Sequence, residues 1–370
     1  MIATVKACAQ TGKRRIFNHD ILSCTHRDVS GNYLYSGRAL GLTCPDDVIQ
    51  IHPFLKQEWP SIRAHYARIG LAHTDHVIWD VDRARMNDHP ELEASMFFFG
   101  PNENRHRRDR EWQRVVEYIN DKNNFVALAS NLRVDIPATR CFHGKQWLAG
   151  IDHFTYPCYV KAAISVAGKG IFRCADSSEL IQSLAYFDED VPVQIQEDIG
   201  DAAFLNLQYE ATDARVNRLL ATEQILDGFS HQGNRYPAPY EPWDAVEPMA
   251  QWLWEKGMRG IFAFDVGVVE SAEGACFRAI ECNPRFNGAS YPSGVARRLQ
   301  LTSWFAKDIA TRIDRLQDID LSGIEYDPAT RRGVIIVNWG TILVGKVGFL
   351  LAGSPEQQCL LEGELLRRLA

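Results

Sequence analysis

The sequence predicts an α/β protein made of several lobes, and three observations support this prediction. The 370 residues are 46% apolar, which is enough to bury a core divided over two or three lobes. After residue 136, two strand-like segments, a helix-like segment and another strand-like segment follow one another, as in a small α+β lobe. From about residue 200 to the end, strand-like and helix-like segments alternate.

Charge and hydropathy exclude two classes of partner. The net charge is -7 and the pI about 5.9, so no basic excess exists to drive binding to nucleic acid or to an anionic membrane. The longest apolar runs are far too short to span a bilayer, and the first 15 residues lack the apolar core of a secretory signal. Nine scattered cysteines without a C-x-x-C pair predict reduced thiols. We therefore expect a cytoplasmic protein.

The elements are expected in the following order. Residues 1–118 mix short apolar runs with polar connections and end in an amphipathic helix, RRDREWQRVVEYIND. The small lobe reads as strands IPATRCF, YPCYVKAAI and GIFRCA, a helix DSSELIQSLAYF capped by Asp176 or Ser177, and a strand VPVQIQEDI. The last part contains strands FLNLQYEA, GIFAFDVGVV, CFRAIECN and GVIIVNWG, and helices PWDAVEPMAQWLWEKG, PSGVARRL and EQQCLLEGELLRRLA.

A polar set at the end of an apolar strand carries the chemistry. Side chains alternate along a strand, so Glu281, Asn283 and Arg285 are expected on one face. If residues 271–275 form the loop of a hairpin, Glu270 pairs with Cys276 and Asp265 lies opposite Glu281. Opposed carboxylates destabilise a sheet unless a cation lies between them.

Two carboxylates and an amide oxygen suit Mg²⁺, with Mn²⁺ as the alternative, and Arg285 is suited to hold a phosphate or a carboxylate. The competing interpretation is a solvated hairpin end with a surface ion pair.

Two lysines are candidate phosphate ligands. Lys161 lies in a predicted strand and is followed by Ser165, Gly168 and Gly170, whose backbone N–H groups could enclose an anion. Lys122 lies at the head of a predicted helix, whose N-terminus also favours an anion.

The ordered segments NDK, IPATR, YVKAAISVAGKGI, VQIQEDI, FDVGVV and IECNPRFNG resemble the successive motifs of the ATP-grasp superfamily over roughly residues 118–305. The resemblance implies an ATP-grasp fold, in which the nucleotide is held between two antiparallel-sheet lobes. It also implies three domains: an N-terminal pre-ATP-grasp α/β domain (1–118), a small lobe (119–198) with the glycine loop 165–170, and a large lobe (199–370) with the metal site.

The resemblance assigns roles to individual residues. Lys122, Lys161, Ser165, Gly168 and Gly170 would bind the phosphates of ATP, and Gln196, Glu197, Ile199 and Asp201 would contact the rest of the nucleotide. Asp265, Glu281 and Asn283 would bind the metal, although the family often has Glu where this chain has Asp265. Arg285 and Lys161 would be catalytic. Substrate contacts are expected from Arg285, Asn287, Ser290, Arg215, Gln224 and His231, and for the last three a structural role remains an equal alternative.

The function implied is an ATP-dependent carboxylate–amine ligase that forms a peptide or lactam bond through an acyl-phosphate, because the segments after QEDI are similar to peptide ligases of specialised metabolism. Its partners would be a small-molecule carboxylate and a small-molecule amine, and a homodimer is left open. The alternatives are an ATP-grasp carboxylase, another phosphoryl-transfer enzyme, and a nucleotide-binding regulatory module without turnover.

Overall fold

The computed structural model describes residues 13–25, 30–100, 107–148, 154–164, 170–200, 202–228 and 230–370. The chain divides into two compact units. The first contains the residues up to Phe98 together with Gln232–Pro237 and Phe286–Ala370, and the second contains Phe99–His231 and Ala238–Arg285.

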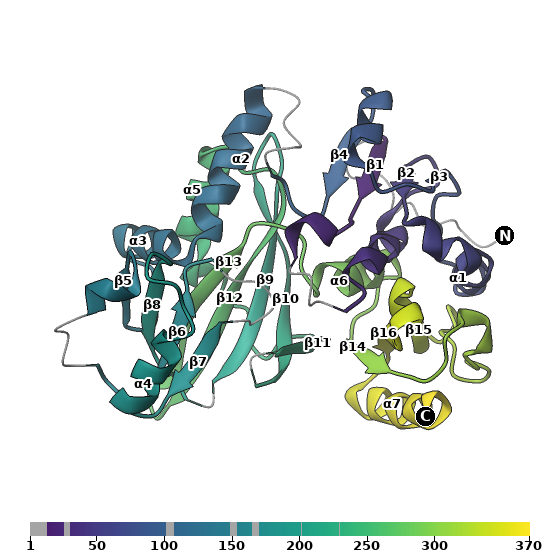
Figure 1. Ribbon diagram of the computed structural model, residues 1–370. Coiled ribbons are helices and arrows are strands. Elements are labelled where there is room, and N and C mark those ends of the chain that lie inside the picture. The colour runs from purple at the N-terminus through teal and green to yellow at the C-terminus, as the bar shows by residue number, and fades with distance from the viewer. Residues whose placement is uncertain are drawn as a thin grey trace. The chain divides into compact units, whose positions relative to one another are not determined.

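The first unit contains a parallel sheet and a set of antiparallel strands (Figure 1). The parallel strands have the order β3-β2-β1-β4, and the antiparallel strands have the order β11-β14-β16-β15. Helix α7 packs on β14, β15 and β16. The elements of this unit are β1 (Arg15–Asn18), β2 (Val48–Gln50), α1 (Trp59–Arg68), β3 (Val77–Ile78), β4 (Glu93–Met96), β11 (Ser230–Tyr236), α6 (Ser290–Arg298), β14 (Trp304–Ala310), β15 (Gly333–Asn338), β16 (Lys346–Ala352) and α7 (Pro355–Leu369).

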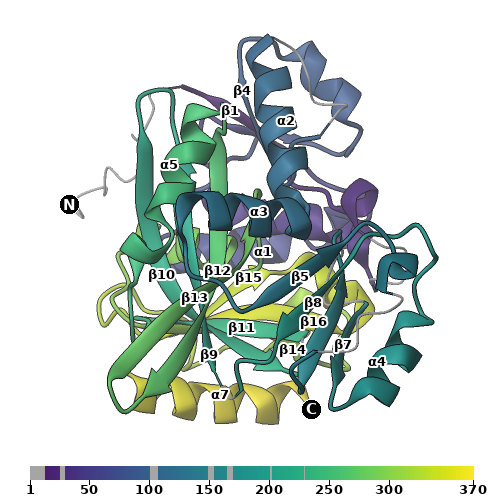
Figure 2. The ribbon, with the colours of Figure 1, turned by 90° about the vertical axis from the view of Figure 1, so that its left-hand side faces the viewer.

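The second unit contains antiparallel strands and the α-helices α2, α3, α4 and α5 (Figure 2). The small sheet has four strands in the order β5-β8-β6-β7. The other strands of this unit belong to a sheet of eight strands, the large sheet, and have the order β13-β12-β9-β10. The elements are α2 (Arg107–Asn120), α3 (Lys122–Leu132), β5 (Thr139–Phe142), β6 (Cys158–Ala162), β7 (Ile171–Cys174), α4 (Ser177–Leu184), β8 (Val193–Glu197), β9 (Ala203–Ala211), β10 (Val216–Asp227), α5 (Glu247–Glu255), β12 (Gly260–Ser271) and β13 (Gly274–Asn283).

The small lobe has the predicted sequence of elements, with Asp176 as the cap of α4. Its core is an apolar cluster that joins the strands to α4 and includes Val160, Leu180 and Ile195. On the large sheet, Phe262 and Phe264 are fully buried on one face of β12, and Asp265 points to the other face. Asp265 therefore lies on the face opposite the buried aromatic side chains.

The two units group the residues differently from the three predicted domains. The predicted boundary at residue 118 falls inside α2, and the predicted large lobe is shared between the units, since residues 286–370 belong to the first. The three predicted domains, with boundaries at residues 118 and 198, therefore stay a prediction.

The thiols correct one expectation. Seven of the described cysteines form no disulfide: Cys24, Cys141, Cys158, Cys174, Cys276, Cys282 and Cys359. Cys44, in contrast, is disulfide-bonded. The prediction that all thiols are reduced is therefore wrong for Cys44.

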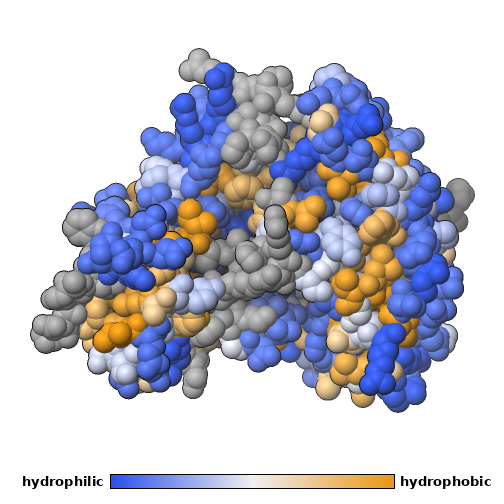
Figure 3. Space-filling model, in the orientation of Figure 1, coloured by the Kyte–Doolittle hydropathy of each residue, from blue (hydrophilic) through white to orange (hydrophobic). Residues whose placement is uncertain are grey.

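The surface in Figure 3 is mostly hydrophilic, with separate apolar patches. In the part of the chain that the structure describes, no helix combines the length and the apolar character needed to cross a membrane.

An ion-paired carboxylate stabilises the first unit. Arg68 donates to Glu325 from Nε and Nη2 at 2.7 and 2.8 Å. His65 Nδ1 lies 2.7 Å from Glu325, and its Nε2 accepts from the Ile336 N–H at 3.0 Å. Burial by itself would raise the pKa of Glu325, but His65 and Arg68 outweigh it and lower the pKa to about 2.

Replacing this carboxylate should destabilise the protein. Because the pKa of Glu325 is depressed on folding, its contribution is fully present above the unfolded-state pKa of about 4.3 and is lost as the pH falls towards 2. We expect Glu325→Gln to lower the free energy of unfolding by about 1–3 kcal/mol at pH 7, and by less at pH 3.5. Urea unfolding at both pH values measures this, and Glu93→Gln, at an exposed glutamate of β4 in the same unit, is the control. An equal loss at both pH values would contradict the assignment.

Candidate functional site

The opposed carboxylates lie on the two strands at one edge of the large sheet. Asp265 on β12 pairs directly with Glu281 on β13, as predicted, and with Asn206 on β9. The route to this pairing differs from the expectation, because the loop contains only residues 272 and 273 and Ser271 pairs with Gly274. A β-bulge at Ile280 then shifts the register by one residue and restores the Asp265–Glu281 pair.

Two amides hold Asp265. Asn206 Nδ2 donates to its Oδ1 at 2.7 Å, and Asn283 Nδ2 donates to its Oδ2 at 3.0 Å. Both amides are buried, and the Oδ1 of Asn206 has no hydrogen-bond partner. An oxygen without a partner beside a carboxylate pair is the kind of atom that a bound cation would satisfy.

Lysine side chains reach the same place from other elements. Lys122, the first residue of α3, lies with its Nζ 3.2 Å from Glu281 Oε2. Lys161 on β6 is buried and donates from Nζ to Gln196 Oε1 at 2.7 Å, and Gln196 donates in turn to Thr139 Oγ1 at 3.0 Å. Burial lowers the pKa of Lys161 to about 8, with a smaller contribution from Lys122, although Glu281 acts in the opposite direction.

The two carboxyl groups respond differently to this environment. Burial and the charge of Glu281 raise the pKa of Asp265. Burial would also raise the pKa of Glu281, but Lys122, Lys161 and Arg285 outweigh it and hold that pKa below its usual range. The charges of the pair are thus balanced by lysines and amides that could instead face a metal ion and phosphate oxygens.

The donors fit a hard divalent cation. No three His, Cys, Asp or Glu side chains in the described ranges are arranged to hold a metal, so a cation here would depend on Asp265, Glu281 and amide oxygens. Carboxylate and amide oxygens are the ligands that Mg²⁺ and Mn²⁺ prefer, with water or phosphate completing the shell. Asp265, Glu281 and Asn283 therefore fit the predicted metal.

The helix terminus expected to bind phosphate is already occupied. Asp121 caps α3 by accepting from the N–H groups of Asn123 and Asn124, and the Lys122 N–H donates to Ala163 O. The expectation of an anion at these N–H groups is therefore wrong, and only the Lys122 side chain remains available.

The predicted adenine segment lies between the two sheets of the second unit. Glu197 Oε2 accepts from Arg278 Nη1 and from the Ala138 N–H, both at 2.9 Å. Ile199 packs so closely over β12 that a Cβ on Gly267 would lie 2.5 Å from its Cδ1. The apolar side chain of Ile199 therefore covers the sheet two residues from Asp265, and its contact with adenine stays a prediction.

Three predicted nucleotide contacts lie outside the described residues: Ser165, Gly168 and Asp201. Gly170, which ends the glycine loop, is described and has a positive φ of 73°. It lies just before β7, at the edge of the small lobe.

The predicted substrate residues are distributed over both units. Arg285 follows β13 and donates to Asn120 Oδ1 at 3.2 Å, so α2 orients it. In the first unit, Asn287 Oδ1 accepts from the N–H and Oγ of Ser290 at 3.2 and 3.1 Å, within the turn that leads into α6. This local role accounts for both residues, and their contact with a substrate stays a prediction.

The other three lie in the turn between β9 and β10, on β10 and on β11. Arg215 is exposed in the turn after β9, Gln224 donates to Leu205 O at 3.4 Å, and His231 is exposed. Their predicted contact with the amine remains untested.

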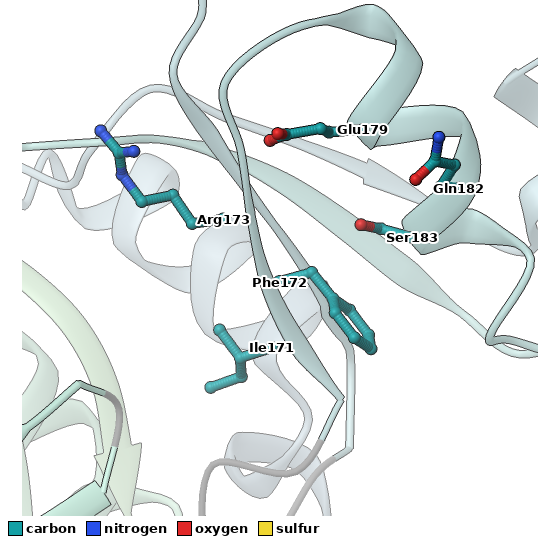
Figure 4. A pocket seen from close by; sticks show the side chains of 6 residues that line it. All are labelled: Ile171, Phe172, Arg173, Glu179, Gln182 and Ser183. Atoms are coloured by element: carbon teal, nitrogen blue, oxygen red, sulfur yellow. The ribbon is translucent and has the colours of Figure 1, made fainter.

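The depression in Figure 4 is a separate feature. It measures about 470 Å³ and is lined by Ile171, Phe172, Arg173, Glu179, Gln182 and Ser183 from β7 and α4. None of these residues belongs to the predicted site, and Arg173 is engaged by Asp198 at 2.6 Å. The depression is therefore separate from the predicted nucleotide site.

Known structures show the same architecture. An N5-carboxyaminoimidazole ribonucleotide synthetase in complex with ADP has a TM-score of 0.58 at 11% identity over 96% of both chains. An N5-carboxyaminoimidazole synthetase from Staphylococcus aureus has 0.58 at 10% over the whole of both chains, and an L-amino acid ligase from Bacillus licheniformis has 0.54 at 14% over 97% of this chain and 98% of that chain. The chain has the ATP-grasp fold. No family model and no curated protein sequence matches it.

Sequence reasoning missed two residues that hold members of this cluster. Asn206 donates to Asp265, and Asn120 accepts from Arg285. A signal for Asn206 was present, because Asn206 and Gln208 alternate with buried apolar residues in the strand FLNLQYEA. No comparable signal marked Asn120, which acts across 165 positions of the chain.

Proposed function

We propose that the protein is an ATP-dependent carboxylate–amine ligase that forms an amide bond through an acyl-phosphate, acting on amino-acid-like substrates. One observation carries this proposal. Lys122 and Lys161, from different elements, converge with the carboxylates Asp265 and Glu281 in one compact unit. Paired carboxylates for a cation beside lysines for phosphate are what phosphoryl transfer from ATP requires.

The chemistry follows from the weakness of a carboxylate as an electrophile. Transfer of the γ-phosphoryl group of ATP to a carboxylate oxygen gives an acyl-phosphate and ADP. A neutral amine then attacks the acyl carbon, phosphate leaves, and the amine loses a proton as the amide forms. No side-chain nucleophile is needed, so positioning and charge neutralisation account for the role of the protein.

Each residue has a definite task in this scheme. Lys122 and Lys161 would neutralise phosphate oxygens, with Gln196 orienting Lys161. Arg285, held by Asn120, would face the carboxylate that is phosphorylated. Mg²⁺ bound by Asp265, Glu281 and Asn283 would neutralise charge on the transferred phosphoryl group.

A carboxylase is the second candidate, because phosphorylation of bicarbonate begins with the same transfer to a carboxylate oxygen. Two solved structures with the same fold carry names of N5-carboxyaminoimidazole synthetases. The complete donor set of Asp265, Glu281 and Asn283 favours turnover over a regulatory module that only binds nucleotide.

The deciding experiment measures ADP and phosphate release from Mg-ATP with single amino acids, with pairs of amino acids and with bicarbonate, and follows products by mass spectrometry. Amino-acid-dependent ADP release with a product lighter than its reactants by one water supports the ligase. Release that depends on bicarbonate supports the carboxylase. ATP binding without turnover under every condition would contradict both.

A further inference from the structure

A buried arginine in the first unit has an open hydrogen-bonding edge. Arg38 lies in the 3-10 segment Asn32–Leu42 between β1 and β2 and is 7% exposed. Its Nε and Nη2 are buried and have no hydrogen-bond partner. These two nitrogens form the edge with which an arginine holds both oxygens of a carboxylate at once.

Aromatic rings hold the guanidinium but leave that edge unsatisfied. Its Cζ lies 4.1 Å from the ring centre of Tyr291, 4.8 Å from that of Phe97 and 4.9 Å from that of Tyr35. Ring faces attract a cation, but they cannot accept two in-plane N–H bonds. A buried charge with unused donors is costly, so a ligand that uses them is favoured.

The surroundings fix the position of Tyr291. His19 is fully buried, with Nδ1 2.8 Å from the Tyr291 hydroxyl and Nε2 3.1 Å from Ser95 Oγ. Burial, with Arg38 and Arg15, holds the pKa of His19 well below its usual range, so the imidazole is neutral. Because His19 is neutral, it does not compete with Arg38 for a bound anion.

A buried carboxylate lies within electrostatic reach of this edge. Asp20 is 6% exposed, its Oδ1 accepts from the Leu22 N–H at 3.0 Å, and its Oδ2 is buried without a partner. Burial raises the pKa of Asp20, and the positive charges of Arg83 and Arg38 act in the opposite direction. Arg38 is therefore close enough to Asp20 to stabilise its negative charge. The two groups therefore offer an open cationic edge and an open anionic oxygen to the same neighbourhood.

The topology marks this place independently. His19 and Asp20 directly follow β1, and Phe97 directly follows β4, so these residues lie at the carboxyl ends of two neighbouring parallel strands. In the order β3-β2-β1-β4, strands β2 and β3 are added on one side of β1, and β4 is then added on the other side of β1. Ligands of open parallel sheets bind at the carboxyl ends of strands where the order reverses in this way.

We propose that the first unit binds an α-amino acid, whose carboxylate is held by the Nε and Nη2 edge of Arg38 and whose ammonium group is held by Asp20. A zwitterion matches the two opposite charges, whereas a phosphate dianion would be repelled by Asp20. Binding requires neither ATP nor turnover, so this site stands or falls separately from the proposed ligase activity.

Calorimetric titration without nucleotide tests the site, with the twenty L-amino acids, with inorganic phosphate, and with the carboxylic acid that lacks the amine of the best ligand. We expect at least one amino acid to bind, and its desamino analogue to bind at least about tenfold more weakly. Arg38→Lys keeps the charge but removes the bidentate edge, and should weaken binding at least about tenfold.

Asp20→Asn is nearly isosteric and provides a second variant if Arg38→Lys does not fold. It should weaken binding of the amino acid and leave binding of the desamino analogue unchanged. Arg63→Lys is the matched control, because Arg63 also lies over a ring, that of Trp59, but is exposed and paired with Asp75. The proposal is overturned if no amino acid binds, if phosphate binds more tightly, or if folded Asp20→Asn binds the amino acid as the wild type does.

Discussion

Glu281→Gln is expected to abolish ADP formation while leaving the fold intact. Glu281 lies opposite Asp265 and pairs with Lys122 at 3.2 Å, so it is the group through which the metal and the phosphate-binding lysine would meet. Glutamine has the same shape but lacks the negative charge. We expect the turnover number to fall at least about 100-fold, as for the loss of a charged group that acts in the transition state.

The measurement is ADP release at saturating Mg-ATP, together with the melting temperature. Glu270→Gln is the matched control, because Glu270 is an exposed glutamate on the same hairpin and bonds only the Tyr240 hydroxyl among the contacts that the structure describes. Its activity should equal that of the wild type. Near-normal turnover in Glu281→Gln with an unchanged melting temperature would remove Glu281 from the metal site.

Lys161→Met is expected to weaken ATP binding strongly. Lys161 is 7% exposed and would meet phosphate where little water screens the charge. We expect the Kd for ATP to rise about 30-fold or more, equal to about 2 kcal/mol. The melting temperature should change little, because methionine has a similar length and a buried ammonium group is itself costly.

A pH profile separates loss of charge from loss of shape. The pKa of Lys161 is about 8 in the free protein, so the ammonium form is lost as the pH rises through 8. The Kd of the wild type should therefore increase above pH 8, and that of Lys161→Met should not follow the same curve. Lys256→Met, at an exposed lysine of the same unit, should bind ATP normally. An unchanged affinity in Lys161→Met would move the nucleotide site elsewhere.

Local patterns were sufficient for the small lobe and for the carboxylate pair. An assumed hairpin register predicted the pair of Asp265 and Glu281, and the cap at Asp176 predicted the start of α4. The same reasoning misjudged the hairpin turn, because a bulge and a shorter loop compensate for one another in the register. It also did not predict β10 and β11, whose polar residues hide the alternation that marks a strand.

The sequence by itself determined which chemical groups are predicted to bind phosphate and metal, and which strands and helices carry them, because period and residue type are local properties. The tertiary structure alone decided which groups meet: Asn206 with Asp265, Lys161 with Gln196, and Arg38 with its three rings. These contacts join positions far apart in the chain, and hydrogen bonds and burial select them only when the strands and helices pack.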